Sequence, residues 1–171
     1  EMWIRDRPYK DPGNYVRYSA RLAAERAATH EAGVIWANQF DNTANLRGHY
    51  RTTGPEIWEQ TGGGIHGFTC AVGSGGTIAG VGKYLKEQKK DVRIALSDPD
   101  GSALYGHYIH GELKAEGNSI SEGIGQGRIT ANLAEAPIDT AYRLSDAEAL
   151  PIIYDLMRDE GLYLGGSTAI N

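Results

Sequence analysis

The chain has 171 residues and a net charge of −5. Its 23 glycines make up about 13% of the residues, against a usual share of about 7%. The acidic balance argues against a nucleic-acid surface, since the densest basic stretch, KEQKK at 86–90, fits a solvated helix end. No apolar run reaches the roughly 20 residues of a membrane span, and the single cysteine, Cys70, excludes an internal disulfide. We expect a globular protein whose glycines form tight turns or let the backbone approach a ligand.

The first 40 residues predict a helix followed by a strand. Residues 1–7 (EMWIRDR) show no hydrophobic periodicity and are interpreted as a non-native leader. Asn14 is a candidate N-cap for an amphipathic helix within residues 11–30. The apolar run GVIWANQF at 33–40 is expected to be a buried strand.

The middle of the chain has the pattern of a βαβ unit. Two helical pieces are expected within residues 41–63, with Pro55 in the first turn of the second. The segments that follow are a strand (65–72), a glycine loop (73–77), a helix (78–88) and a strand (91–99). This order is typical of two parallel strands joined by a helix.

The last third contains one clear helix. Residues 101–130 are rich in loop-forming residues. Ser145 and Glu148 match a capping box at the start of a helix over 145–161. The final segment, 162–171 (LYLGGSTAIN), is expected to be a short strand running into a second loop of glycine and hydroxyl residues.

The glycine loop favours an anion. A loop between a parallel strand and the start of a helix presents unpaired backbone N–H groups, and the helix dipole adds about half a positive charge. Ser74 and Thr77 add hydroxyl donors. A simple turn without a ligand is the structural alternative, but four glycines within residues 71–80 exceed what a turn requires.

Three kinds of phosphate site could use such a loop. A P-loop is excluded because no Lys-Ser or Lys-Thr follows. A dinucleotide fingerprint fits at Gly73 and Gly75 but has Ile78 in its third position, and Asp98 could serve as the ribose-binding acid. A nucleotide-binding Rossmann-like module therefore stays open. Pyridoxal 5′-phosphate (PLP), a compact phosphate ester, fits at least as well.

Seven stretches carry a specific resemblance, namely YKDPGNY, WANQFDNTAN, TGPEIWEQT, VGSGGTIAGVGKYLK, SDPDGSALY, SISEGIGQGRITANL and DEGLYLGGSTAIN. They resemble, in order, the cysteine synthase (O-acetylserine sulfhydrylase) family. The resemblance implies an α/β fold with three αβα layers and a mostly parallel sheet, PLP fold type II (tryptophan synthase β-like). It assigns residues 8–40 to the end of a small mobile domain and 41–171 to part of the large PLP-binding domain.

The resemblance also implies residue roles. The loop that holds the PLP phosphate is matched by Gly73, Ser74, Gly75, Gly76 and Thr77. Ser167 matches the serine that pairs with the pyridine nitrogen, Gln39 a substrate-carboxylate ligand, and Gly123 a loop near the substrate. Without the resemblance, Ser167 would be read as a serine that caps a strand end, Gln39 as a polar residue at a strand end and Gly123 as a loop glycine. The resemblance places Asn42 and Asn45 near the same site, but both are interpreted as structural turns.

The other residues that could ligate a metal or react chemically have structural explanations. His107 and His110 lack a third ligand at metal spacing, so no metal is expected. Cys70 is expected in the core. The Schiff-base lysine of the family lies in a motif upstream of YKDPGNY that this chain does not contain. We therefore expect a truncated fragment with no catalytic lysine, which is inactive alone.

For the intact enzyme, the resemblance implies PLP-dependent β-replacement that converts O-acetyl-L-serine and sulfide into L-cysteine and acetate. It implies a cytoplasmic homodimer that acts on small molecules, with no nucleic-acid or membrane partner. Cystathionine β-synthase is a close relative, although GPEIWEQT and GIGQGRITANL look more like cysteine synthase. Two alternatives to the enzyme remain: the nucleotide-binding module, and a non-catalytic binding or regulatory module.

Overall fold

The computed structural model describes residues 9–171. They form two compact units that divide between Gln39 and Phe40. The first unit contains helix α1 (Tyr15–Ala27), and the Asn14 side chain caps it by accepting a hydrogen bond of 3.0 Å from the Val16 N–H. The predicted cap and helix are therefore confirmed, whereas the leader proposed for residues 1–7 lies outside the described residues.

The strand predicted over residues 33–40 is wrong. This segment has no regular structure, and the Ile35 side chain is 98% exposed. A strand forms only when a neighbour completes its ladder of hydrogen bonds, and no strand among residues 9–171 pairs with this segment.

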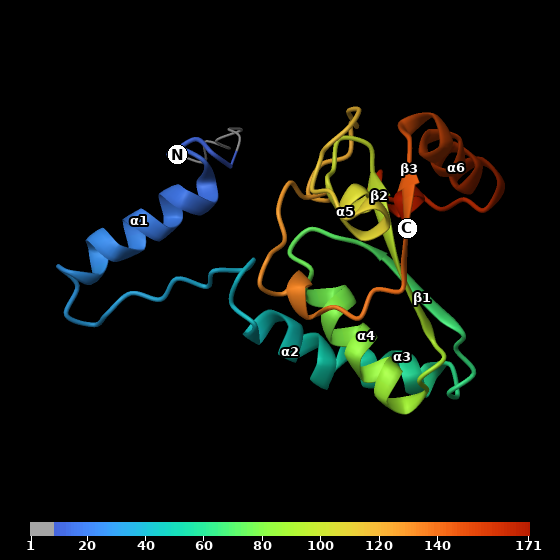
Figure 1. Cartoon of the computed structure of the whole chain (residues 1–171), viewed down its shortest axis with the longest axis horizontal. Coiled ribbons are helices and arrows are strands. Elements are labelled where there is room, and N and C mark those ends of the chain that lie inside the picture. Colours follow the sequence, from blue (N-terminus) through green and yellow to red (C-terminus); the bar gives the residue numbers. More distant parts are fainter. Residues whose placement is uncertain (1–8) are drawn as a thin grey trace. The chain divides into compact units, whose positions relative to one another are not determined.

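The second unit is built on three parallel strands in the order β1-β2-β3 (Figure 1). Their bounds are β1 Gly67–Ala71, β2 Arg93–Pro99 and β3 Thr140–Leu144. Cys70 pairs with Leu96, and Leu96 pairs with Ala141. Helix α4 (Gly76–Gln88) connects β1 to β2, which confirms the βαβ unit. β3 was not predicted from the sequence.

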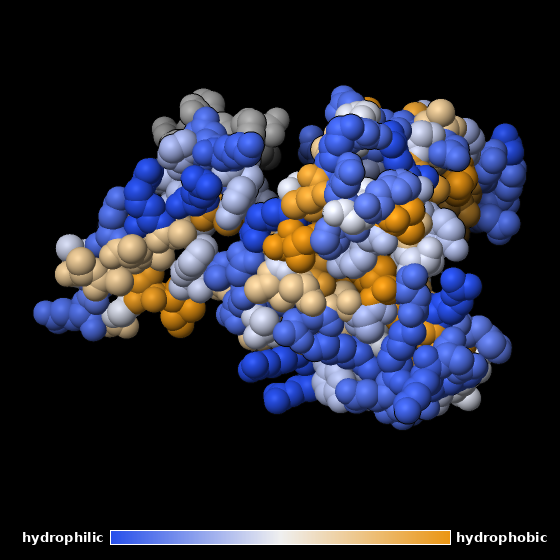
Figure 2. All heavy atoms as spheres, in the orientation of Figure 1, coloured by the Kyte–Doolittle hydropathy of each residue, from blue (hydrophilic) through white to orange (hydrophobic). Residues whose placement is uncertain are grey.

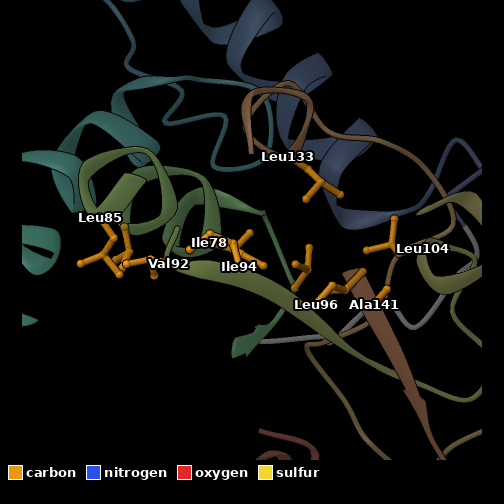
Figure 3. Packing of buried hydrophobic residues seen from close by; sticks show 10 residues of the cluster. Ile78, Leu85, Val92, Ile94, Leu96, Leu104, Leu133 and Ala141 are labelled. Atoms are coloured by element: carbon orange, nitrogen blue, oxygen red, sulfur yellow. The ribbon is translucent and has the colours of Figure 1, made fainter. Parts of the chain in front are cut away.

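One face of the sheet carries the main core. Helices α2 (Ala44–Arg51), α3 (Thr53–Gln60) and α5 (Leu104–His110) and the short 3₁₀ helix η1 (Leu133–Glu135) lie with α4 on this side. Figure 3 shows Ile78 and Leu85 of α4 with Val92, Ile94 and Leu96 from the β2 region. Each of these side chains is fully buried, and each such burial contributes about 1.5–3 kcal/mol.

The opposite face is covered only near the C-terminal ends of the strands. There α6 (Asp146–Asp159) and α7 (Ser167–Ile170) contribute Ala149, Ala169 and Ile170, which pack near Ala71 and Leu144. Helices on both faces give the three layers expected from the resemblance. The predicted capping box is present, since Ser145 and Glu148 exchange both hydrogen bonds.

The strand predicted at the start of 162–171 is also wrong. Residues 162–165 have no regular structure, the Tyr163 side chain is 88% exposed, and α7 follows. No described strand pairs with these residues, so nothing holds them extended.

The surface over α3 and the C-terminal end of α4 is mostly hydrophilic (Figure 2). Two lysines of the basic stretch have partners there: Lys86 bonds Asp139, and Lys89 donates to the Ile65 carbonyl. This fits the solvated helix end predicted for residues 86–90. Within residues 9–171, no helix has the length and apolar character needed to cross a bilayer.

Candidate functional site

The glycine loop lies where β1 ends and α4 begins. Gly75 is the N-cap of α4 and has φ of +85°, a conformation that strains residues with a Cβ. A Cβ at Gly75 would also lie 2.7 Å from Leu133 Cβ and 2.8 Å from its Cα. Only glycine satisfies both constraints here, so η1 can pack directly against the loop.

The loop presents unpaired backbone donors. Among the described residues, no acceptor is present for the backbone N–H groups of Gly73, Ser74, Gly75 and Thr77. N–H groups at a helix N-terminus point away from the helix, and the dipole makes this end positive. The arrangement is suited to an anion such as phosphate.

Both hydroxyl groups of the loop contact α2. Ser74 Oγ accepts hydrogen bonds from Asn45 Nδ2 at 3.0 Å and from the Gly76 N–H at 3.3 Å. Thr77 Oγ1 lies 3.3 Å from His49 Nε2. The interpretation of Asn45 as a structural turn is therefore wrong: it lies in helix α2 and its side chain holds Ser74. Asn42 does stabilise a turn, because its Oδ1 accepts from the Ala44 N–H at 3.0 Å.

A second support comes from residues 128–133. Thr130 Oγ1 donates to the Ser74 carbonyl at 2.6 Å. Asn132 Oδ1 accepts from the Leu46 N–H at 3.2 Å, and its Nδ2 donates to the Phe40 carbonyl at 2.7 Å. Both side chains are fully buried. No role was predicted for Thr130 or Asn132 from the sequence; the available signal was that both are polar residues within the GIGQGRITANL stretch.

An ion pair fixes this second support. Arg128 makes two hydrogen bonds to Asp41, of 3.0 and 2.8 Å, and Asp41 also accepts from the Ala131 N–H at 2.9 Å. These contacts, led by the bond from Arg128, hold the pKa of the Asp41 carboxyl below its usual value. The segment before α2 is thereby tied to the segment that holds Ser74.

The structure brings Gly123 next to the loop. A Cβ at Gly73 would lie 2.7 Å from the Gly123 carbonyl oxygen, so the two backbones are in contact. The neighbouring Gly125 N–H donates to the Val72 carbonyl at 2.8 Å. Gly123 has φ of +78° and open space where its Cβ would be. The open space leaves room beside Gly123, and its approach to a substrate stays a prediction.

Ser167 is connected to the strand that precedes the loop. It begins α7, and its carbonyl accepts from Asn171 Nδ2 at 2.8 Å. Asn171 Oδ1 in turn accepts from the N–H of Ala71, the last residue of β1, at 2.7 Å. Ser167 also lines a cavity of about 330 Å³ together with Ser121 and Glu122, the neighbour of Gly123.

Gln39 belongs to a different unit from the other predicted residues. It is the last residue of the first unit, where it is exposed, whereas the glycine loop, Gly123 and Ser167 belong to the second unit. Its contact with a substrate carboxylate stays a prediction.

The dinucleotide alternative loses its candidate ribose-binding acid, and the mismatch at its third glycine position remains. Ile78, in place of the third glycine, is fully buried in the core. Asp98 is fully buried as well, and its Oδ2 accepts from the Tyr105 N–H at 2.8 Å. Burial raises the pKa of this carboxyl. Asp98 is therefore not exposed for a bond to a ribose hydroxyl.

Other reactive groups are engaged elsewhere. Cys70 packs against the core, as predicted, and burial raises the pKa of its thiol to about 11. Lys83, Lys86 and Lys114 each pair with a carboxylate at the surface. Residues 9–171 contain no group of three His, Cys, Asp or Glu side chains that could hold a metal.

Comparison with known proteins identifies the relatives of this chain. The sequence profile described as pyridoxal-phosphate dependent enzyme matches residues 7–171. Cysteine synthase 1 of Neurospora crassa is 46% identical over 168 residues, which cover 95% of this chain and 43% of that protein. Cysteine synthase A of Escherichia coli is 36% identical over 85% of this chain and 46% of its own length.

A solved structure shares the fold. The O-acetylserine dependent cystathionine β-synthase of Helicobacter pylori matches with a TM-score of 0.74 and 30% identity, over 88% of this chain and 47% of that one. The chain thus spans less than half the length of these relatives.

Proposed function

The chain belongs to the family of pyridoxal-phosphate dependent enzymes, and we propose that it carries the cofactor-binding part of a cysteine synthase. Cysteine synthases of two fungi, Neurospora crassa and Emericella nidulans, are 46% identical to it over 95% of its length. The proposed reaction converts O-acetyl-L-serine and sulfide into L-cysteine and acetate. From the resemblance we also propose that the enzyme is a homodimer and that it lies in the cytoplasm. Size-exclusion chromatography would test the first property and cell fractionation the second.

The observation that supports cofactor binding is the donor set of the glycine loop. Unpaired N–H groups of Gly73, Ser74, Gly75 and Thr77 lie at the positive end of α4. A dianionic phosphate ester matches this charge and these donors. These residues would hold the phosphate group and keep water away from it.

Ser167 would act at the other end of the cofactor. A serine hydroxyl is neutral and both donates and accepts a hydrogen bond. It can therefore bond the pyridine nitrogen without forcing that nitrogen to be protonated. When bound, PLP supplies the electron sink that lets the acetate group leave the β-carbon of the substrate. Gly123 would orient the substrate through close approach of its backbone. Gln39 would do so by donating a hydrogen bond from its side-chain amide to the substrate carboxylate.

The test uses the full-length protein. It is incubated with PLP, O-acetylserine and sulfide, and both visible absorption of bound PLP and cysteine formation are measured. Absence of PLP-dependent absorption would contradict the proposal. A matched variant, Ser167→Asp, replaces the neutral partner of the pyridine nitrogen with an anion; it is expected to keep PLP bound and to slow cysteine formation.

A second candidate is β-replacement with homocysteine. The Helicobacter pylori structure is described as a cystathionine β-synthase that depends on O-acetylserine. Parallel assays with sulfide and with homocysteine as the acceptor separate the two reactions. Preferential formation of cystathionine would replace the cysteine synthase proposal and leave the cofactor site unchanged.

A further inference from the structure

Helix α2 presents two polar side chains, one helical turn apart, to the glycine loop. Asn45 Nδ2 lies 3.0 Å from Ser74 Oγ, and His49 Nε2 lies 3.3 Å from Thr77 Oγ1. Residues spaced by four lie on one face of a helix, so a single face of α2 reaches both hydroxyl groups.

Two glycines of α4 permit this approach. A Cβ at Gly76 would lie 2.1 Å from Asn45 Oδ1, and a Cβ at Gly80 would lie 2.3 Å from the Leu46 carbonyl oxygen. The backbones of the two helices are therefore in direct contact. The geometry between α2 and the loop is set by packing and leaves little freedom for the two polar side chains.

The bonds at Ser74 determine where its hydroxyl hydrogen points. A serine hydroxyl has one donor and two acceptor positions. Asn45 Nδ2 and the Gly76 N–H occupy both acceptor positions. The remaining hydrogen can donate only to an acceptor, which is also the kind of group that the unpaired N–H groups beside it require.

His49 gives Thr77 the same property. His49 Nδ1 lies 3.0 Å from Thr53 Oγ1. When the Thr53 hydroxyl donates to Nδ1, the ring hydrogen is on Nε2 and donates to Thr77 Oγ1. The Thr77 hydroxyl hydrogen is then free for a ligand. The chain of donors runs from Thr53 through His49 to Thr77.

We propose that Asn45 and His49 are positioning residues that aim the hydroxyl hydrogens of Ser74 and Thr77 at the phosphate group of the ligand. This inference rests on the proposed function, which supplies PLP as the phosphate ester. Neither residue touches the phosphate itself; each acts by occupying an acceptor position on a loop hydroxyl.

The test measures binding by full-length apoprotein of three probes: PLP, pyridoxal, which has the same ring and aldehyde without the phosphate, and inorganic phosphate. Asn45→Leu and His49→Leu are expected to weaken PLP and phosphate binding by about tenfold or more, since each misdirects one bond to a charged group. Pyridoxal binding is expected to stay unchanged. His49→Gln, which can both accept and donate, is expected to recover most of the affinity for PLP.

Controls separate positioning from folding. Arg47→Gln changes an exposed residue of the same helix and is expected to bind all three probes as the wild type does. Thr53→Val acts on Thr77 only through His49 and is expected to weaken PLP binding without affecting pyridoxal, which keeps the test valid if a leucine variant fails to fold. Equal weakening of PLP and pyridoxal, or no weakening of PLP, would overturn the inference.

The same experiment distinguishes this inference from the proposed function. If wild-type protein binds phosphate but not PLP, the proposed function fails, and the phosphate affinities of the variants still decide the positioning role. If the wild type binds neither probe, both are overturned.

Discussion

Replacing Gly80 of α4 with alanine tests the direct contact between α2 and α4. An alanine Cβ at this position would lie 2.3 Å from the Leu46 carbonyl oxygen and 2.7 Å from the Tyr50 nitrogen. Both are backbone atoms, so no side-chain rotation relieves the contact. Helix α2 would have to move away by about 1 Å to restore ordinary separations.

The two opposing effects can be compared in size. Alanine in a helix interior is favoured over glycine by about 0.5–1 kcal/mol. Overpacking a close contact costs about 1–3 kcal/mol, and a contact between two backbones lies at the upper end. We expect the overpacking to dominate and the free energy of unfolding to fall by about 2 kcal/mol. The same movement would take Asn45 and His49 beyond hydrogen-bond distance of the loop hydroxyls.

The assay is urea unfolding of the full-length apoprotein, followed by PLP titration. Gly48→Ala is the matched control, because it lies in α2 with no atom within 4 Å of its Cβ position. It is expected to raise the free energy of unfolding by about 0.5–1 kcal/mol. If Gly80→Ala were as stabilising as Gly48→Ala, the close helix contact would be refuted.

Three further predictions follow from single contacts. Asp41→Asn is expected to lower the free energy of unfolding by about 1 kcal/mol at neutral pH through loss of the Arg128 pair. Since folding lowers the Asp41 pKa from 3.8, this stabilisation is present above that value and is lost as pH falls through the folded pKa. The free energy of unfolding in urea, measured between pH 7 and 3, should therefore fall less steeply with acid in the variant than in the wild type. The same pH dependence in both proteins would argue against the pair. Cys70 is half-buried, and burial raises the pKa of its thiol to about 11, so a thiol reagent at pH 8 is expected to label it much more slowly in native than in unfolded protein; equal rates would contradict the raised pKa. Ser145→Ala removes the capping box of α6 and should lower the free energy of unfolding in urea by about 1 kcal/mol, whereas Ser145→Asp, which keeps an oxygen acceptor at the N-cap, should keep most of that stability.

Much of the fold and of the loop could be predicted from local patterns. The β1–α4–β2 unit has apolar runs of strand and helix length separated by a glycine loop, and each of these signals lies within a few residues. The capping residues Asn14 and Ser145 act on N–H groups two and three positions away. Strand β3 lacks such a signal: it has five residues, and its pairing with β2 makes it a strand.

The errors at 33–40 and 162–165 have the same origin. Both segments are apolar enough to be buried strands, yet Ile35 and Tyr163 are almost fully exposed. Apolar composition predicts that a segment can enter a sheet, but the sheet exists only where a neighbour supplies the hydrogen bonds. The residues of the segment itself do not indicate whether such a neighbouring strand is present.

Local sequence was enough to predict that residues 73–77 join a strand to a helix and that glycine and hydroxyl residues there suit an anion, because helix ends and glycine conformations are local properties. The residues that support the loop could be identified only from the folded chain. Asn45, His49 and Thr130 reach it from 29, 28 and 56 residues away. Their hydrogen bonds arise from the packing of α2 and η1 on α4, and packing depends on the whole core rather than on neighbouring residues.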